Sequence, residues 1–302
     1  MIVWRGALAR TGGTVCIRIV EAVLAHHGVT PRRITTDDLR GCRVQVIRHA
    51  DGGRTVRLPP GMFEDAVYVG GSDGFFHPVF AAPPFRVFYI RRDLRHALAS
   101  YKRLMRNPDF DTLLRLARDL ARKGRHMEGL PDERCLKLAY EADILNLASG
   151  VRRLADFIGH PVDAATVAAL AERYDRTGVR QYLARLEQQA RKVLAPWRAP
   201  AADTKVVTLA LENGREETLY VPRPAVIESS ERLGRMLVRR PDGAEQRLWA
   251  NAGSRTWRLG FEGFQSGFIG DDGDWRDAFT GDEQARLTEA VAPYLEAIGI
   301  TP

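Results

Sequence analysis

The chain of 302 residues has little cysteine, no long apolar run and no dense block of basic residues. Its three cysteines, Cys16, Cys42 and Cys135, are odd in number and far apart, which argues against a disulfide framework and against a zinc site. We expect three reduced, mostly buried thiols. No group of His, Cys and carboxylate residues has the spacing of metal ligands, so no metal is predicted.

No apolar run reaches the roughly 18 residues that a membrane-spanning helix needs. The apolar segment 2–8 is too short and interrupted for a secretory signal. A cytoplasmic protein without an integral membrane segment is therefore expected. The net charge of +7 favours an anionic ligand. Because no basic run is interleaved with aromatic residues, a nucleotide or an acidic glycan is favoured over nucleic acid.

The first half of the chain alternates short apolar runs with stretches of helical periodicity. Strands separated by helices indicate a parallel sheet with helices on both of its faces. Apolar runs predict strands at 2–8, 66–69, 85–90 and 135–140, with a hairpin formed by 43–47 and 55–58. Periodicity predicts helices from Cys16 to a stop at Gly28, and at 94–105, 113–123, 151–158, 164–174 and 281–297.

Residues 196–259 show a different pattern, in which short apolar runs are separated by turn residues. Asn213-Gly214 and Pro241-Asp242-Gly243 each separate two short apolar runs, which is a strong hairpin signal. We interpret the chain as one α/β domain over residues 1–302, in which 196–259 form a β-rich insertion or lid.

A turn that carries two glycines, Arg10-Thr11-Gly12-Gly13-Thr14, lies between the first predicted strand and the first helix. Backbone N–H groups converge at such a helix N-terminus, and the helix dipole adds positive potential, so the turn can bind an anion. An ordinary strand-to-helix turn with a threonine cap is the alternative. The turn lacks the spacing G-x-x-x-x-G-K-[ST], which argues against a P-loop kinase or NTPase.

A second motif is the apolar strand that ends in Arg92-Asp93 and is followed by Ser100-Tyr101 on a helix. This arrangement resembles the 3′-phosphate-binding element of sulfotransferases that use 3′-phosphoadenosine 5′-phosphosulfate (PAPS). The turn at 10–14 is similar to the 5′-phosphosulfate loop of that family.

Two further segments resemble the family, and all four occur in the family's order. Residues 138–143, Leu-Ala-Tyr-Glu-Ala-Asp, followed by residues 151–162, are similar to its Tyr-Glu-Asp strand end and the arginine-rich helix after it. Residues 273–280, Gly-Asp-Trp-Arg-Asp-Ala-Phe-Thr, are similar to its Gly-Asp-Trp-Lys-x-x-Phe-Thr segment. Trp275 is expected to anchor the last helix in the core.

The resemblance implies a P-loop NTPase-like three-layer α/β sandwich, in which helices flank a central parallel sheet. It also implies transfer of a sulfuryl group from PAPS, the co-substrate, to a hydroxyl or amine of a small-molecule or saccharide acceptor. A catalytically incompetent or repurposed member that binds a nucleotide or a partner is the alternative.

By resemblance, Arg92 and Ser100 would hold the 3′-phosphate, and Tyr140 would lie near the adenine. Arg10, Thr11, Gly12, Gly13 and Thr14 would bind the phosphosulfate, with Arg10 stabilising charge on the leaving 5′-phosphate. Read without the family, Arg92 could pair with Asp93 or Glu141, Ser100 could bond to its own backbone, and Tyr140 could be a buried strand-end residue. Arg91 and Arg95 are expected to be solvated neighbours.

The sequence departs from the family pattern at two places. Many members carry a histidine base at the end of the strand before the Arg92 strand, but residues 69–74 contain none. His77 and Asp73 are the predicted general bases, and His49 and Glu64 stay open. At 268–270 the chain has Phe-Ile-Gly where the family often has Arg-Lys-Gly, so Arg255 or Arg258 would have to replace those charges.

Overall fold

The computed structural model describes most of the chain. The described residues are 1–6, 8, 11–35, 38, 45–48, 54–59, 61–71, 85–104, 108–211, 215–230, 235–250, 256–261, 264–265 and 273–301. Several residues named above lie outside these ranges: Arg10, Cys42, His49, Asp73, His77, Arg255 and the segment 268–270.

The chain forms two compact units. The first comprises Met1–Lys102, Pro108–Asp175 and Asp272–Pro302, and the second comprises Arg103–Asn107 and Arg176–Asp271. The second unit is wider than the β-rich segment 196–259 because it includes a long helix, α7 (Arg176–Val193). A lid role for this part of the chain stays a prediction.

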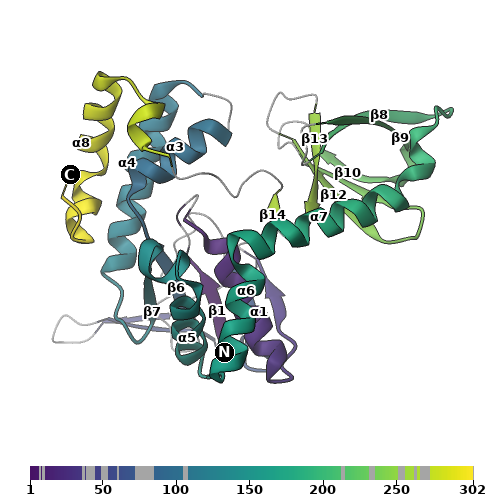
Figure 1. Ribbon diagram of the computed structural model, residues 1–302. Coiled ribbons are helices and arrows are strands. Elements are labelled where there is room, and N and C mark those ends of the chain that lie inside the picture. The colour runs from purple at the N-terminus through teal and green to yellow at the C-terminus, as the bar shows by residue number, and fades with distance from the viewer. Residues whose placement is uncertain are drawn as a thin grey trace. The chain divides into compact units, whose positions relative to one another are not determined.

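A parallel sheet forms the centre of the first unit (Figure 1). Its strand order is β2-β5-β1-β6-β7, and every neighbouring pair is parallel. The strands are β1 (Ile2–Arg5), β2 (Arg32–Ile34), β5 (Tyr68–Gly71), β6 (Phe85–Arg91) and β7 (Cys135–Ala139). The predicted hairpin is also present, as the antiparallel pair β3 (Gln45–Arg48) and β4 (Arg54–Arg57).

Apolar residues cover both faces of the sheet because successive strand side chains point to opposite sides. In β6, Phe88 and Ile90 pack into one cluster, and Val87 and Tyr89 pack into another on the opposite face. The first cluster is closed by α1 (Gly13–His26), α5 (Leu147–Ile158) and α6 (Ala164–Tyr174). The predicted α/β architecture with a parallel sheet between helices is confirmed.

A separate helical cluster joins distant parts of the first unit. It contains α3 (Leu94–Leu104), α4 (Phe110–Glu128) and the last helix, α8 (Gly281–Ala297). Figure 1 shows α8 alongside α4. Gly124 of α4 allows this approach, since a side chain there would clash with the Tyr294 ring. Trp275, in the short helix η5 (Trp275–Ala278), is buried in the same cluster, so its predicted role as a core anchor is confirmed.

The second unit consists of α7 and an all-β region. Its sheet order is β10-β11-β12-β13-β8-β9, with β14 paired to β13. Both predicted hairpins are present, as the antiparallel pairs β8–β9 and β11–β12. The strands are β8 (Thr204–Ala210), β9 (Glu216–Pro222), β10 (Val226–Ser230), β11 (Arg235–Arg239), β12 (Glu245–Trp249), β13 (Thr256–Phe261) and β14 (Phe264–Gln265), with short helices η3 (Ala195–Arg198) and η4 (Arg223–Ala225).

Candidate functional site

Three motifs of the sequence meet at one edge of the parallel sheet. Because β1 pairs with β6 and β6 pairs with β7 in parallel, the carboxyl ends of all three strands lie at the same edge. The loop before α1 follows β1, Arg92 follows β6, and Tyr140 follows β7. Ligands of open α/β sheets bind outside this edge, so it is the natural place for a site.

The loop before α1 presents its backbone to this edge. Gly12 is the N-cap of α1, and its φ of 87° is in the left-handed region that favours glycine. The helix begins without a side-chain cap, and the carbonyl of Gly12 accepts the first bond, from Val15 N, at 3.1 Å. The first N–H groups of a helix have no acceptor within it, so Gly13 and Thr14 can offer theirs to an anion.

The two threonines of the loop make different bonds. The Thr11 hydroxyl is buried and donates to the carbonyl of Leu8 at 2.9 Å, so it stabilises the loop. The Thr14 hydroxyl accepts from Nη1 of Arg5 at 3.2 Å. Since a guanidinium only donates, the Thr14 proton is directed elsewhere and is available to an incoming oxyanion.

Arg5 is a cation of this edge that the sequence motifs did not reveal. It ends β1 and lies across Gly71 at the end of β5, where a Cβ would come within 2.6 Å of the Arg5 Cβ. Its position at the end of an apolar strand, five residues before Arg10, was the available signal. Arg5 therefore adds positive charge beside the loop, at the end of the strand next to the one where the family pattern expects a histidine.

Arg92 and Tyr140 lie against each other. The guanidinium carbon of Arg92 is 3.8 Å from the centre of the Tyr140 ring, and Arg92 is only 6% exposed. Another neighbour of this ring is the loop, because a Cβ on Gly12 would come within 3.7 Å of Tyr140 Cε2. Tyr140 thus connects the loop motif with the strand-end motif, and the cation–π contact orients Arg92.

Asp93, the carboxylate that follows Arg92 in the sequence, is hydrogen-bonded to Arg95. Asp93 accepts from the side chain of Arg95 at 2.8 to 3.0 Å and from the Arg95 backbone N–H at 2.9 Å, which also caps α3. Arg95 is buried, so the expectation that it is a solvated neighbour is wrong. Arg91 is not simply solvated either, because it makes paired hydrogen bonds with Glu128 at 2.7 and 2.5 Å.

Asp143 fixes the backbone that carries Tyr140. Residues Tyr140–Ile144 form η2, a π-helical turn directly after β7. The buried Asp143 carboxylate accepts from Ala139 N at 2.9 Å, from Ser149 Oγ at 2.7 Å and from Arg153. A π-turn is frequent at functional sites, and here three hydrogen bonds hold it in place.

Ser100 and Glu64 are the other predicted site residues that the structure describes. Ser100 is half-buried on α3, two turns after the helix begins. Glu64 is exposed and precedes β5. It is two residues before Ala66, whose carbonyl accepts a hydrogen bond from the Met1 backbone nitrogen at the start of β1. Glu64 therefore lies at the opposite edge of the sheet. Arg10, Asp73 and His77 lie outside the described residues, and their roles stay predictions.

The described cysteines are not nucleophiles at neutral pH. Cys16 on α1 and Cys135 on β7 are buried free thiols. Burial raises the pKa of each to about 12, and Arg5 lowers the pKa of Cys16 only in part. Among the described residues, no group of three His, Cys, Asp or Glu could hold a metal ion, and no helix is long and apolar enough to cross a membrane.

No family model and no curated protein matches the chain. Solved structures do match it. The match to the structure of mouse sulfotransferase SULT7A1 complexed with PAP covers 98% of this chain and 84% of the SULT7A1 chain. The TM-score is 0.50 at 10% sequence identity. The match to the structure of retinol dehydratase in a complex with retinol and PAP covers 98% of this chain and 81% of the retinol dehydratase chain. The TM-score is 0.46 at 13% sequence identity.

The chain has the sulfotransferase fold. The resemblance that the four motifs indicated is therefore confirmed at the level of the fold. Within this sulfotransferase fold, Gly12, Arg92 and Tyr140 are brought together at one sheet edge, as the motifs predicted separately. Arg5 and the three bonds to Asp143 are what sequence reasoning missed there.

Proposed function

We propose that the protein transfers a sulfuryl group from PAPS to a hydroxyl or amine of a small-molecule or saccharide acceptor. The observation that carries this proposal is the convergence of Gly12 and Arg92 on Tyr140 at the carboxyl edge of a sheet with the sulfotransferase fold. The neighbour SULT7A1 was crystallised with PAP, which is adenosine 3′,5′-bisphosphate, the desulfated form of PAPS.

The described residues fit a nucleotide that carries anionic groups at both ends. The open N-terminus of α1 offers backbone N–H groups to one end. Arg92, which lies against the Tyr140 ring, would donate paired charged hydrogen bonds to the other end. Ser100 and Tyr140 stay proposed contacts of the 3′-phosphate and of the adenine.

Sulfuryl transfer requires positioning and charge stabilisation more than covalent catalysis. Negative charge grows on the leaving 5′-phosphate, next to the loop that Arg10 and Thr14 belong to. Arg5 supports this step by holding the Thr14 hydroxyl as a donor. An acceptor hydroxyl must lose its proton to a base, for which His77 and Asp73 are our candidates. Arg5 cannot be that base, since a guanidinium stays protonated.

Nucleotide binding is the first test. Isothermal titration calorimetry with PAP should show one site, whereas no heat at millimolar PAP would contradict the proposal. Arg92→Ala should weaken PAP binding at least tenfold more than it weakens binding of 5′-AMP, since only PAP has the 3′-phosphate. Arg152→Ala, an exposed arginine on α5, is the matched control and should change neither affinity.

Transfer itself is the second test, and it separates the proposal from a repurposed fold that binds without catalysis. Radiolabelled PAPS should yield labelled product with at least one member of a panel of hydroxyl and amine acceptors. His77→Ala and Asp73→Asn should identify the base by a loss in kcat while PAP affinity is retained. PAP binding without transfer to any acceptor would support the repurposed alternative. A cytoplasmic location stays a prediction that cell fractionation can check.

A further inference from the structure

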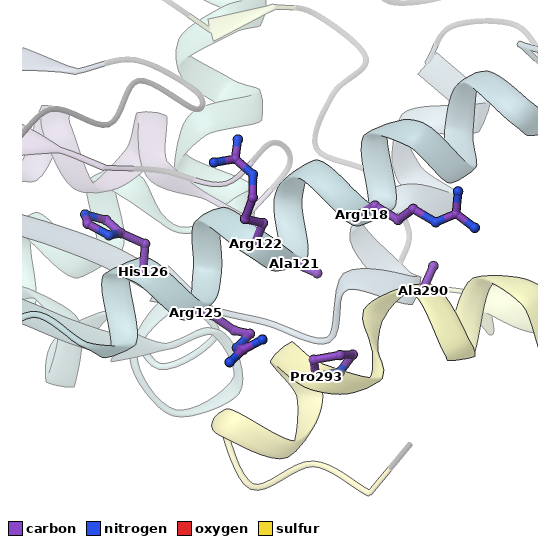
Figure 2. Close-up of a pocket in the computed structure, with 7 residues that line it drawn as sticks. All are labelled: Arg118, Ala121, Arg122, Arg125, His126, Ala290 and Pro293. Atoms are coloured by element: carbon purple, nitrogen blue, oxygen red, sulfur yellow. The ribbon is translucent and has the colours of Figure 1, made fainter.

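A basic hollow lies on the first unit between α4 and α8, and it shares no residue with the site described above. Figure 2 shows its lining, which has four basic side chains on α4, together with Ala121 of α4 and with Ala290 and Pro293 of α8. Its volume is about 440 Å³, within the usual range of small-molecule sites. The lining residues are Arg118, Ala121, Arg122, Arg125, His126, Ala290 and Pro293.

The spacing of the arginines follows from the helix. Arg118, Arg122 and Arg125 are four and three residues apart, so they project from one face of α4, and Arg118 and Arg125 are separated by roughly 10 Å along the axis. Ala121 and Ala290 contribute only short side chains to the lining. A ligand held by all three must therefore be elongated and carry more than one anionic group.

The charges of the hollow are poorly neutralised by the protein. None of the described residues that line it is acidic. Arg122 pairs with Asp119 at 2.8 Å, but its side chain is 75% exposed, and such surface pairs contribute little. Within the described residues, the side chains of Arg118 and Arg125 form no ion pair. Like charges one helical turn apart repel each other, and a bound anion would relieve that repulsion.

We propose that this hollow binds a small linear polyanion with two or more phosphate groups. A carboxylate carries one charge in one plane, whereas a terminal phosphate carries up to two charges and three outward oxygens. A short chain of phosphates can therefore accept from guanidinium groups on successive turns of α4. Among the described residues of the lining, only the imidazole of His126 offers a ring on which a base could stack, which disfavours single-stranded nucleic acid. The proposal does not depend on sulfuryl transfer.

Calorimetric titration of the full chain with sodium tripolyphosphate, in metal-free buffer with 0.1 M salt, tests the proposal. The triple variant Arg118→Gln, Arg122→Gln, Arg125→Gln should bind at least tenfold more weakly. The matched control Arg152→Gln, Arg173→Gln, Arg185→Gln removes the same charge from exposed positions on α5, α6 and α7 and should change affinity less than twofold. Equal losses in both variants, or no heat with the unaltered protein at millimolar tripolyphosphate, would overturn the proposal.

Three further arms define the site and the ligand. Ala290→Leu fills the hollow without changing charge and should also weaken binding, which keeps the test decisive if the triple variant misfolds. Arg92→Ala should bind tripolyphosphate as well as the unaltered protein does. A clear loss there would place the ligand at the sheet edge and refute the hollow. Citrate binding as tightly as tripolyphosphate would refute the preference for phosphate.

Discussion

Among single residues, Gly12 combines a positive φ with close contacts at the sheet edge. Its φ is positive, and a Cβ there would lie 3.0 Å from Ile144 Cγ2, so that the Ile144 side chain would have to move. Gly28, at the other end of α1, has a similar φ of 71°, but a Cβ there would meet nothing within 4 Å. The two glycines thus share one backbone requirement but have different surroundings.

This pair yields a matched prediction. Gly12→Ala and Gly28→Ala should each lower the free energy of unfolding by about 1 to 2 kcal/mol, because both place an L-residue at positive φ. Only Gly12→Ala should also weaken PAP binding, by tenfold or more, because it moves the loop against Ile144 and Tyr140. Thermal melting and calorimetry measure the two effects. Equal PAP affinities of the two variants would contradict a role for Gly12 in the site.

A second prediction at this scale concerns the thiols. Because burial raises their pKa to about 12, Cys16 and Cys135 should stay protonated and resist iodoacetamide at pH 8 until the protein unfolds. A raised thiol pKa stabilises the fold below the unfolded value of 9.0, and that contribution is lost as the pH rises from 9.0 towards about 12. Peptide mapping by mass spectrometry checks the labelling, and fast modification of either residue would refute the prediction.

At the scale of elements, the turn η2 depends on one carboxylate. Asp143 joins the end of β7 to α5, since its partners are Ala139, Ser149 and Arg153. Gly150 permits this approach, because a side chain there would clash with the Asp143 carbonyl. The position of Tyr140, and through it that of Arg92, therefore depends on α5.

Asp143→Ala should consequently affect both stability and binding. It removes the acceptor of the Ala139 N–H and of the Ser149 hydroxyl, whereas Arg153 keeps its bond to the Lys137 carbonyl. The free energy of unfolding should therefore fall by about 2 kcal/mol. PAP affinity should fall because η2 loses its anchor. Asp156→Ala, an exposed carboxylate on the same α5 helix, is the control and should do neither. Chemical denaturation and calorimetry provide the readouts, and an unchanged midpoint for Asp143→Ala would exclude the anchoring role.

The elements also show which parts of the fold sequence patterns could predict. The helix 281–297 has the bounds that periodicity predicted, and a local capping box of Thr280 and Glu283 defines where it begins. By contrast, β2 is a strand with two exposed arginines out of three residues, and only its pairing with β5 defines it. The turn η2 was missed for a similar reason, since its partners Ser149 and Arg153 lie well beyond any local pattern.

In the site, too, sequence patterns predicted individual residues but not the contacts between them. Gly12, Arg92 and Tyr140 were each predicted from a motif, because strand ends and glycine turns leave local signals. Their contact was not predictable, because it joins residues on three different strand ends. The pairing of Arg95 with Asp93 was also missed, because an arginine next to a strand end gives no sign that it will be buried.

At the scale of the whole molecule, two units of different architecture allow a prediction about ligand stabilisation. All described residues assigned to the PAPS site belong to the first unit. PAP at a hundred times its dissociation constant should stabilise that unit by about 2.7 kcal/mol, which corresponds to a rise in melting temperature of roughly 5 to 10 °C. Differential scanning calorimetry measures this rise.

The location of the effect can be checked by hydrogen exchange. PAP should increase protection at the loop before α1 and at η2, and leave strands β8–β12 unchanged. Arg92→Ala is the control and should show a smaller rise in protection at the same PAP concentration. A rise in protection confined to the second unit would place the nucleotide elsewhere.

The packing of the last helix has a consequence for synthesis on the ribosome. Leu94 and Leu98 of α3, the helix that carries Ser100, bury their side chains in a cluster with Trp275, Leu287 and Val291. Those partners are translated more than 170 residues later. A nascent chain can therefore form the strands early, yet α3 lacks its apolar cover until residues 275–291 have been translated, and nucleotide binding should begin only then.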